Sequence, residues 1–338
     1  MIKKLLREGF IKNNLNEGPI KLFEIVKNYY ELSGDLYEDI NNLNELYVYL
    51  KEENTEDDFN PFSHGEELDD TNVEEKNDCL LTFSNGNTKL DWPYFSLPAG
   101  YTCPFATACK TFAAKAGKKF KDGKSTKKGK NTKYKCYAAR EQGQYPSLNK
   151  KVFTNLSLLM TAAKDDGIEG MAKLIIESIE YHKLQNSKIF RIHESGDFFS
   201  DAYFKAWIKV ANYFPTTTFY THTTSLDFWI RNKSAMPNNM NLIASMDSDN
   251  EETIIKNGLR YSKVVYSVNE AKQLRLKIDY DDRLACCSDE NFALLIHGQQ
   301  DAGSEASKAV TANKDVYKQM KKLHSKDKSI RQDLLKNK

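Results

Sequence analysis

The feature that most constrains the fold is a series of four short apolar runs in the second half of the chain, each followed by a turn or a helix. The runs cover residues 188–193, 216–222, 241–246 and 262–267, so they begin 28, 25 and 21 residues apart. Runs of this length indicate buried strands, and the intervals leave room for the crossovers that parallel strands need. The pattern predicts an α/β fold, with either a partial or complete (β/α) barrel-like parallel sheet or an open doubly wound sheet.

Helical periodicity separates and precedes these runs. Residues 168–184 place apolar side chains along one side, which is typical of an amphipathic helix that packs on a sheet. Residues 201–212 follow Ser200, a favourable N-cap. The segment 136–160 begins as a helix, breaks at Tyr145–Pro146 and resumes. No G-x-G-x-x-G follows any apolar run, which argues against dinucleotide binding.

The chain divides into three parts by composition. Residues 1–78 read as a helical N-terminal extension followed by an acidic linker, 79–300 as the α/β core, and 301–338 as a basic C-terminal helix or tail. Within the core, 79–83 is predicted as a strand that enters a hairpin at Asn85-Gly86. The acidic residues 52–78 are interpreted as a solvated linker, with an acidic segment that binds a partner or mimics DNA as the alternative.

Overall charge and apolar content indicate a cytoplasmic protein. The 49 Lys and Arg residues against 47 Asp and Glu give a formal net charge of +2, so bulk charge does not favour polyanion binding. No apolar run is long enough for a membrane span or a signal peptide. The six cysteines are therefore expected to be reduced, and clustered cysteines are expected to bind a metal or be redox-active.

Three of the cysteines gather in residues 97–140, at Cys103, Cys109 and Cys136. Thiolates are soft ligands that suit zinc, iron–sulfur clusters or copper(I), although this spacing matches neither zinc ribbons nor ferredoxins. Two metal sites are compatible with it: a 4Fe-4S cluster with one iron open to a substrate or cofactor, or structural zinc with a fourth ligand elsewhere. The alternative is three reduced thiols that serve as small apolar side chains.

A flexible lysine-rich insert, residues 110–135, separates the last two of these cysteines and contains a single acidic residue. Lysines that neutralise backbone phosphates gain from counterion release, so we predict contact with DNA or RNA, and the alternative is a solvated loop. Tyrosines at its exit would stack on bases, and Arg140 would share a helix face with Cys136. The predicted nucleic-acid contacts are Lys118, Lys119, Lys121, Lys124, Lys127, Lys128, Lys130, Tyr134 and Arg140.

Polar side chains follow every predicted strand, where parallel α/β folds place their functional groups. The candidates for catalysis are His193, Glu194, Asp197, His222 and Asp247. Strand alternation places Arg191 and His193 on one face and Glu194 on the other. A histidine there suits proton donation or metal binding, whereas the alternatives are a structural histidine, a capping carboxylate at Asp197 and ordinary turn chemistry at Asp247.

The segments LPAGYTCPFATAC, KCYAAREQGQYP, RIHESGDFFSDAYFKAWIKVA and TTTFYTHTTS resemble the bacteriophage gene product 88 family, over about residues 81–249. The resemblance implies a barrel-like α/β fold with a cysteine-bound metal or iron–sulfur centre, similar to that of radical-SAM enzymes. The chain lacks their C-x3-C-x2-C signature, which argues against S-adenosylmethionine as a cofactor. Of a cysteine-rich tail, only Cys286 and Cys287 remain, which argues against a second metal centre.

These observations lead to three hypotheses. The first is a phage-type iron–sulfur enzyme, with the cluster on Cys103, Cys109 and Cys136, that acts on a nucleotide or nucleic acid. The second is a non-catalytic nucleic-acid-binding protein with structural zinc. The third is a protein that engages a host protein through residues 52–78, and each places the chain in the host cytoplasm. Cys286 and Cys287 are interpreted as buried thiols, either of which could supply a fourth metal ligand.

Overall fold

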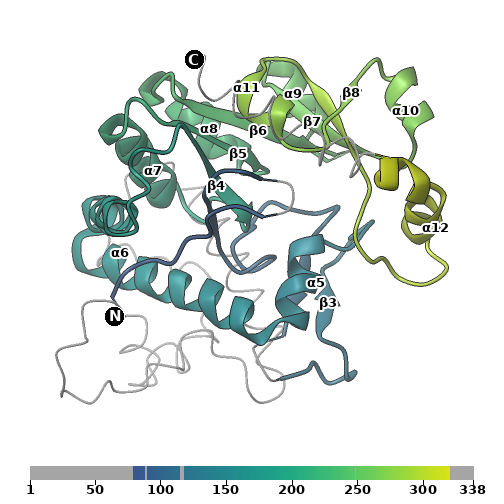
Figure 1. Cartoon of the computed structure of the whole chain (residues 1–338), viewed down its shortest axis with the longest axis horizontal. Helices are drawn as coiled ribbons and strands as arrows, with labels where there is room; N and C mark the ends of the chain where they lie inside the picture. The colour runs from purple at the N-terminus through teal and green to yellow at the C-terminus, as the bar shows by residue number, and fades with distance from the viewer. Residues whose placement is uncertain (1–78, 88–89, 115–117, 248, 320–338) are drawn as a thin grey trace, which may run out of the picture. The chain divides into compact units, whose positions relative to one another are not determined.

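The computed structural model describes residues 79–87, 90–114, 118–247 and 249–319, all within the unit Glu74–Lys338. The predicted helical extension, the acidic linker with its predicted host-protein contact, and half of the basic C-terminal segment (320–338) lie outside these ranges. Figure 1 shows the sheet strands side by side, with long helices packed against them.

The core is a seven-stranded sheet in which every pairing is parallel. The predicted α/β class and parallel pairing are therefore confirmed. Each predicted apolar run forms a strand within two residues of its expected bounds. The hydrogen-bonded order is β1 (Tyr94–Ser96), β4 (Ile189–Ser195), β5 (Thr218–Thr223), β6 (Met240–Met246), β7 (Tyr261–Val265), β9 (Phe292–Leu295) and β8 (Lys277–Ile278).

Helices connect these strands as crossovers. The predicted break at Tyr145 separates α5 from α6, and a second irregularity at Asp166 and Gly167 lies inside α6. The hydroxyl of Ser200 accepts a hydrogen bond from the backbone N–H of Tyr203 and begins α7, as predicted. The helices are α5 (Tyr137–Gln144), α6 (Pro146–Tyr181), α7 (Asp201–Tyr213), α8 (Leu226–Asn232), η2 (Lys233–Ala235), α9 (Glu251–Lys256), α10 (Val268–Gln273), α11 (Arg283–Cys287) and α12 (Glu305–Ala312).

The two faces of the sheet have different coverings. One face, here called the α7 face, packs on α6, α7 and α8 through an aromatic-rich core that includes Phe190, Trp207 and Phe219. The opposite face, here called the α11 face, packs its amino-terminal half on α11 and on Trp92, through Tyr220 and Phe292. Burial of large apolar side chains on both faces stabilises the fold and fixes the directions in which the strand ends point.

The predicted strand at 79–83 is wrong. The segment joins the structure through an isolated bridge between Ser84 and Tyr94, because side chains of α6 satisfy its backbone instead of a neighbouring strand. Ser178 Oγ accepts from the N–H of Leu81 at 2.9 Å, and the amide of Asn155 exchanges two hydrogen bonds with Thr82. These side chains occupy backbone groups of Leu81 and Thr82 that a strand would use for ladder pairing.

The lysine-rich insert contains regular structure that its composition did not predict. Strands β2 (Thr111–Ala113) and β3 (Thr126–Lys128) pair as an antiparallel hairpin. Thr111 and Ala113 are fully buried beneath it, whereas most of its lysines are exposed. The segment from Lys110 to Lys135 is called the lysine hairpin below.

None of the helices in the described ranges is long and apolar enough to cross a bilayer.

Candidate functional site

The candidate site lies beyond the carboxyl ends of β1, β4, β5 and β6. The loop that leaves β1 carries Cys103 and Cys109 and leads into the lysine hairpin, and Cys136 follows the hairpin directly before α5. This loop, residues 97–109, is called the cysteine loop. All three candidate ligands therefore come from the connection between the first and second strands of the sheet order.

A buried glutamine fastens the cysteine loop to β4. Gln142 on α5 accepts a hydrogen bond from the N–H of Ala99 at 3.0 Å and donates to the hydroxyl of Ser195 at 2.9 Å. Ser195 in turn donates to the carbonyl of Leu97 at 2.8 Å. Because buried, fully paired amide and hydroxyl groups hold a single geometry, the loop is fixed against the strand end.

Gly196 makes this contact possible. Its φ of +84° lies in the left-handed region, and a Cβ there would lie 2.6 Å from Thr102 Oγ1 and 2.7 Å from Leu97 Cβ. Only glycine fits this position without strain. The turn after β4, residues 194–197, and the cysteine loop are thus packed directly on each other.

The three thiols lie close enough to act on one another electrostatically. Burial raises the pKa of the Cys103 thiol, and negative charge at Asp197, Cys109 or Cys136 would raise it further. Burial also raises the pKa of Cys109, with a contribution from Cys136. In the absence of a cation the site therefore holds neutral thiols, whereas a bound metal would stabilise the thiolates.

Cys136 occupies the N-cap position of α5. Burial raises the pKa of its thiol, and the backbone N–H groups of Ala139 and Ala138 partly offset that effect. Exposed N–H groups at a helix N-terminus favour negative charge. Cys136 is therefore placed to carry a thiolate once a cation is present.

No group of three or more Cys, His, Asp or Glu side chains in the described ranges is arranged to hold a single metal ion. A tetrahedral zinc ion bonds each sulfur at about 2.3 Å, which brings the sulfurs within roughly 3.8 Å of each other. The thiols as they stand are not arranged in that way.

Asp197 is buried beside the cysteine loop, and its carboxylate oxygens are fully engaged. Oδ1 accepts hydrogen bonds from Thr223 Oγ1 at 2.6 Å and from the N–H of Phe198 at 2.7 Å. Oδ2 accepts from the N–H of Thr224 at 2.7 Å and from its hydroxyl at 2.8 Å. Burial raises its pKa, and these hydrogen bonds oppose the rise. The carboxylate ties the end of β4 to the end of β5.

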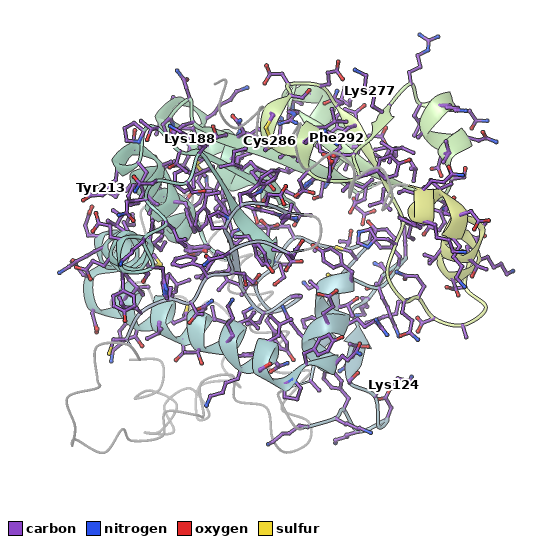
Figure 2. The ribbon with its side chains drawn as sticks, viewed as in Figure 1. Lys124, Lys188, Tyr213, Lys277, Cys286 and Phe292 are labelled. Carbon is purple, nitrogen blue, oxygen red and sulfur yellow. A yellow bond between two sulfur atoms is a disulfide. The ribbon has the colours of Figure 1, made fainter. Side chains whose placement is uncertain are left out.

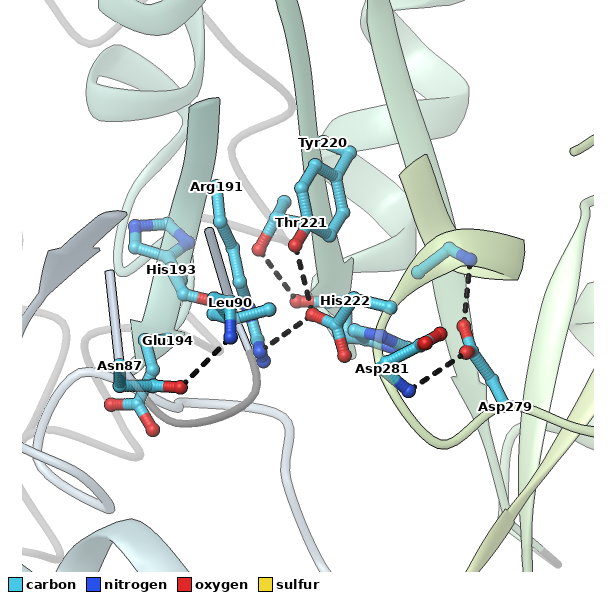
Figure 3. Close-up of polar contacts among 12 residues, drawn as sticks. Asn87, Leu90, Arg191, His193, Glu194, Tyr220, Thr221, His222, Asp279 and Asp281 are labelled. Carbon is cyan, nitrogen blue, oxygen red and sulfur yellow. Dashed lines mark hydrogen bonds and ion pairs between the residues drawn. The ribbon is translucent and has the colours of Figure 1, made fainter. Parts of the chain in front are cut away.

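His193 lies on the α7 face, opposite to the expected side. Its Nε2 lies 3.1 Å from the hydroxyl of Tyr203, and its ring packs on Phe198 and Trp207. The cause is an irregular register. Tyr94 pairs with Arg191 and Ser96 pairs with Ser195, so two steps along β1 correspond to four steps along β4. Figure 3 shows the His193 ring turned away from Arg191 and Glu194.

Glu194 consequently shares the α11 face with Arg191. Its Oε2 accepts a hydrogen bond from Ser96 Oγ at 3.3 Å, and its backbone carbonyl accepts from the hydroxyl of Tyr137 at 2.8 Å. Its charge also contributes to the raised pKa of Cys136, after burial. Of the five predicted catalytic residues, Glu194 is the one on the α11 face whose charge acts on a candidate metal ligand.

His222 lies on the α11 face of β5. Its Nδ1 is 3.0 Å from Ser262 Oγ, and the edge of its ring meets Phe292. Burial, with a further contribution from the positive charge of Arg191, lowers the pKa of His222 to about 4. The ring is therefore neutral at neutral pH and suited to hydrogen bonding.

Asp247 links the end of β6 to the cysteine loop. Its Oδ2 accepts a hydrogen bond from Thr107 Oγ1 at 3.1 Å, while its Oδ1 and backbone N–H take part in the turn with Asp249 and Asn250. Burial raises the pKa of Tyr134, and charges at Cys109 and Asp247 add to the rise. Asp247, Tyr134 and Cys109 thus lie near one another at the strand ends.

The lysine hairpin presents an exposed cationic surface beside the thiols. Lys118, Lys119, Lys121, Lys124, Lys127 and Lys130 are exposed, and Arg140 is partly exposed on α5. Within this surface Lys124 pairs with Asp122 at 3.1 Å, and Lys128 and Lys135 pair with Asp301 at 3.4 and 2.6 Å. Figure 2 shows Lys124 at the hairpin, at the opposite edge of the view from Cys286 and Phe292.

Three site features were missed by reasoning from sequence. Arg191 pairs with Asp282 at 2.8 Å, and the hydroxyl of Tyr220 donates to the same carboxylate at 2.8 Å. Gln142 fastens the cysteine loop. The only sequence signal for the ion pair was an arginine inside an apolar strand, which is rarely buried without a partner.

Cys286 and Cys287 form a disulfide between adjacent residues, so the prediction of two reduced thiols is wrong. Cys286 is buried and Cys287 is exposed, and both lie in α11, on the amino-terminal half of the α11 face. A bonded pair offers no thiolate to a metal, so neither supplies a fourth ligand in this state.

Comparison with known proteins identifies relatives among bacteriophage proteins. The family model described as Gene product 88 matches residues 66–314. The Gene 88 protein of Mycobacterium phage D29 is 27% identical over 152 residues, which is 45% of this chain and 54% of the relative. The Gene 88 protein of Mycobacterium phage L5 is 28% identical over the same length, with the same coverage. The chain thus spans about half the length of the relatives it matches, and no solved structure matches it.

Proposed function

The chain belongs to the Gene product 88 family of phage proteins, and from that premise we propose that it is an iron–sulfur protein whose cluster is held by Cys103, Cys109 and Cys136. The observation that supports the proposal is that three thiols, separated by up to 33 residues of sequence, lie at the carboxyl edge of a parallel sheet, near enough to influence one another's pKa. Functional groups of parallel α/β proteins gather at this edge.

The donor set fits a four-iron cluster better than a single ion. Each cysteine of such a cluster binds a different iron, so the thiols need not approach a common point. Asp197, whose charge acts on Cys103 and Cys109, accepts four hydrogen bonds within the protein and is not available as a fourth ligand. Three ligands leave one iron open to a substrate or cofactor.

The surrounding residues have supporting roles. The N-terminus of α5 favours the negative charge of Cys136, and Gln142 and Gly196 fix the loop that carries the other two thiols. A bound cluster of this kind supplies electron transfer or Lewis-acid chemistry at its open iron. Glu194 and Asp247 would position the substrate beside it, each at the end of a different strand.

The test is anaerobic purification of the full chain, with measurement of iron, acid-labile sulfide and visible absorption. We expect a brown protein with iron and sulfide in equal amounts, and loss of most of both in Cys103→Ser, Cys109→Ser and Cys136→Ser. Cys79→Ser is the matched control, because Cys79 is exposed and lies outside the loop. A colourless protein with stoichiometric zinc would overturn the proposal in favour of a zinc-binding protein.

The lysine hairpin suggests that the substrate is a nucleotide or a nucleic acid. Residues 110–135 hold 11 lysines and one aspartate, and the hairpin begins after Cys109 and ends before Cys136. A phosphate backbone bound along it would be delivered next to the thiols. Binding of this type depends on salt and is indifferent to sequence.

Retention of single-stranded DNA and RNA as a function of salt tests this part of the proposal. Replacement of Lys118, Lys121, Lys124 and Lys127 by Gln should reduce the magnitude of the slope of log affinity against log salt by about three. Lys173→Gln on α6, whose side chain is exposed, controls for loss of any surface lysine. Equal slopes in the wild type and the four-lysine variant would contradict the proposal that the lysine hairpin binds nucleic acid.

A further inference from the structure

The α11 face changes from apolar to polar along the direction of the strands. In its amino-terminal half, Ile189, Tyr220, Ile243 and Phe292 are all buried, at no more than 8% exposed. One step further along the strands, Arg191, Glu194, His222 and Ser245 are each partly exposed. A sheet face that is buried and apolar in its amino-terminal half, and polar and partly exposed further along the strands, is typical of a ligand-binding surface. This set is called the polar layer.

Arg191 is rigidly held but keeps hydrogen-bonding capacity. Its Nε donates to the carbonyl of His193 at 2.8 Å, and its Nη1 donates to Asp282 at 2.8 Å. Nη2 makes no hydrogen bond to any described residue. A guanidinium fixed at two corners presents its third as an oriented donor.

The neighbours of Arg191 offer complementary atoms. Glu194 uses Oε2 for Ser96, and its Oε1 has no hydrogen bond within the described part of the chain. His222 uses Nδ1 for Ser262, and its Nε2 likewise has none there. Arg191 pairs in register with Tyr220, two residues before His222. A donor, an acceptor and a neutral imidazole are therefore available on two adjacent strands.

The charge of the polar layer decides what kind of ligand it suits. Asp282 neutralises Arg191, Glu194 adds one negative charge, and His222 is neutral. The layer is therefore not an anion site, and phosphates would be held by the lysine hairpin instead. It suits a neutral group that both accepts and donates hydrogen bonds.

We propose that the polar layer binds a nucleobase, with Arg191 Nη2 donating to a base oxygen or ring nitrogen and Glu194 Oε1 accepting from a base N–H. The inference deepens the proposed function, on which it rests for the nucleotide class of the substrate. Nucleobases carry adjacent donors and acceptors on one planar edge, and enzymes read extruded bases in this way.

The path from the hairpin to the polar layer is short. Tyr137 is the first residue of α5 after Cys136, and its hydroxyl donates to the carbonyl of Glu194 at 2.8 Å. Its ring lies 4.9 Å from that of His297. A nucleotide whose phosphate contacts the lysines would thus place its base toward Glu194 and Arg191, beside the thiols.

The experiment is titration of the anaerobically purified full chain with guanosine, adenosine, cytidine and thymidine by ligand-observed NMR, with ribose 5-phosphate as the probe without a base. We expect at least one nucleoside to bind and ribose 5-phosphate not to compete with it. Glu194→Gln and the charge-balanced double variant Arg191→Met/Asp282→Asn should each weaken nucleoside binding about tenfold or more, the effect of losing one charge-assisted hydrogen bond.

Lys173→Gln is the control and should leave nucleoside binding unchanged, because Lys173 is exposed on α6, outside the polar layer and the lysine hairpin. The proposal is overturned if no nucleoside binds the wild type, if ribose 5-phosphate competes equally, or if both variants bind as the wild type does. Iron and sulfide are measured in the same samples. A full complement of cluster with no nucleoside binding refutes the base site alone, whereas loss of both refutes the proposed function.

Discussion

The two faces of the sheet place a histidine in opposite surroundings, one apolar and one polar. His193 on the α7 face lies among Phe198, Tyr203 and Trp207, and its Nδ1 is buried without a hydrogen-bond partner in the described structure. His222 on the α11 face bonds Ser262 and borders a polar, partly exposed layer. Two histidines at neighbouring strand ends thus differ in whether they can contact a ligand. The elements that pack on each face decide whether a strand end belongs to the apolar core or to a partly exposed polar surface.

The Arg191–Asp282 ion pair of the α11 face, in which both side chains are partly exposed, provides the largest test of this contrast. Arg191→Met alone should destabilise the protein by about 3–5 kcal/mol, because it removes the positive charge that compensates the largely buried carboxylate of Asp282. Arg191→Met/Asp282→Asn should recover most of that loss. Urea denaturation of the two variants measures both values, and equal destabilisation would show that the pair itself, rather than charge balance, supports the α11 face.

The contact between the cysteine loop and the turn after β4 comes next. Gly196→Ala should cost about 2–4 kcal/mol, because the new methyl group meets Thr102 and Leu97 at a left-handed backbone position. Gly123→Ala is the matched control: its φ is +75°, but no atom lies within 4 Å of the added Cβ. The control should cost only the backbone strain, about 1–2 kcal/mol. Similar values for both variants would mean that the loop is not packed on the turn.

Much of the fold was predictable because strand and helix periods are local. The four apolar runs, the break at Tyr145 and the Ser200 cap depend on neighbours in sequence, and the structure bears them out. The face of His193 was not predictable, since it depends on a register irregularity against β1. Asp282 lies 91 residues from Arg191, and no local pattern joins them.

The two histidines should also differ in their effect on the pH dependence of stability. Burial lowers the pKa of His193 from 6.5 to about 3. Between these pH values the histidine is protonated in the unfolded chain and neutral in the folded chain. The resulting cost to stability grows as pH falls from 6.5 toward 3, by up to about 1.4 kcal/mol per pH unit. His193→Gln should flatten stability against pH across that window.

His222→Gln should flatten stability over the narrower window between 6.5 and about 4, in which the pKa of His222 is displaced. Chemical denaturation at half-unit pH steps distinguishes the two variants. If the His222 variant shows the wider window, the assignment of the two faces is reversed.

The smallest effect is expected at the rim, where Asp301 pairs with Lys128 and Lys135. Asp301 is 44% exposed, so Asp301→Asn should change stability by at most about 0.5 kcal/mol. It should nevertheless tighten binding of single-stranded nucleic acid at low salt, since two lysines gain freedom to contact phosphate. Filter-binding assays measure this change, and weaker binding would place Asp301 in the nucleic-acid contact itself.

Mössbauer spectroscopy of the anaerobically purified chain, loaded with isotopically enriched iron, tests the central claim most directly. The account predicts a 4Fe-4S cluster in which one iron differs from the other three, because only three cysteines bind it. Protein without iron and sulfide, or a cluster with four equivalent irons, would contradict it.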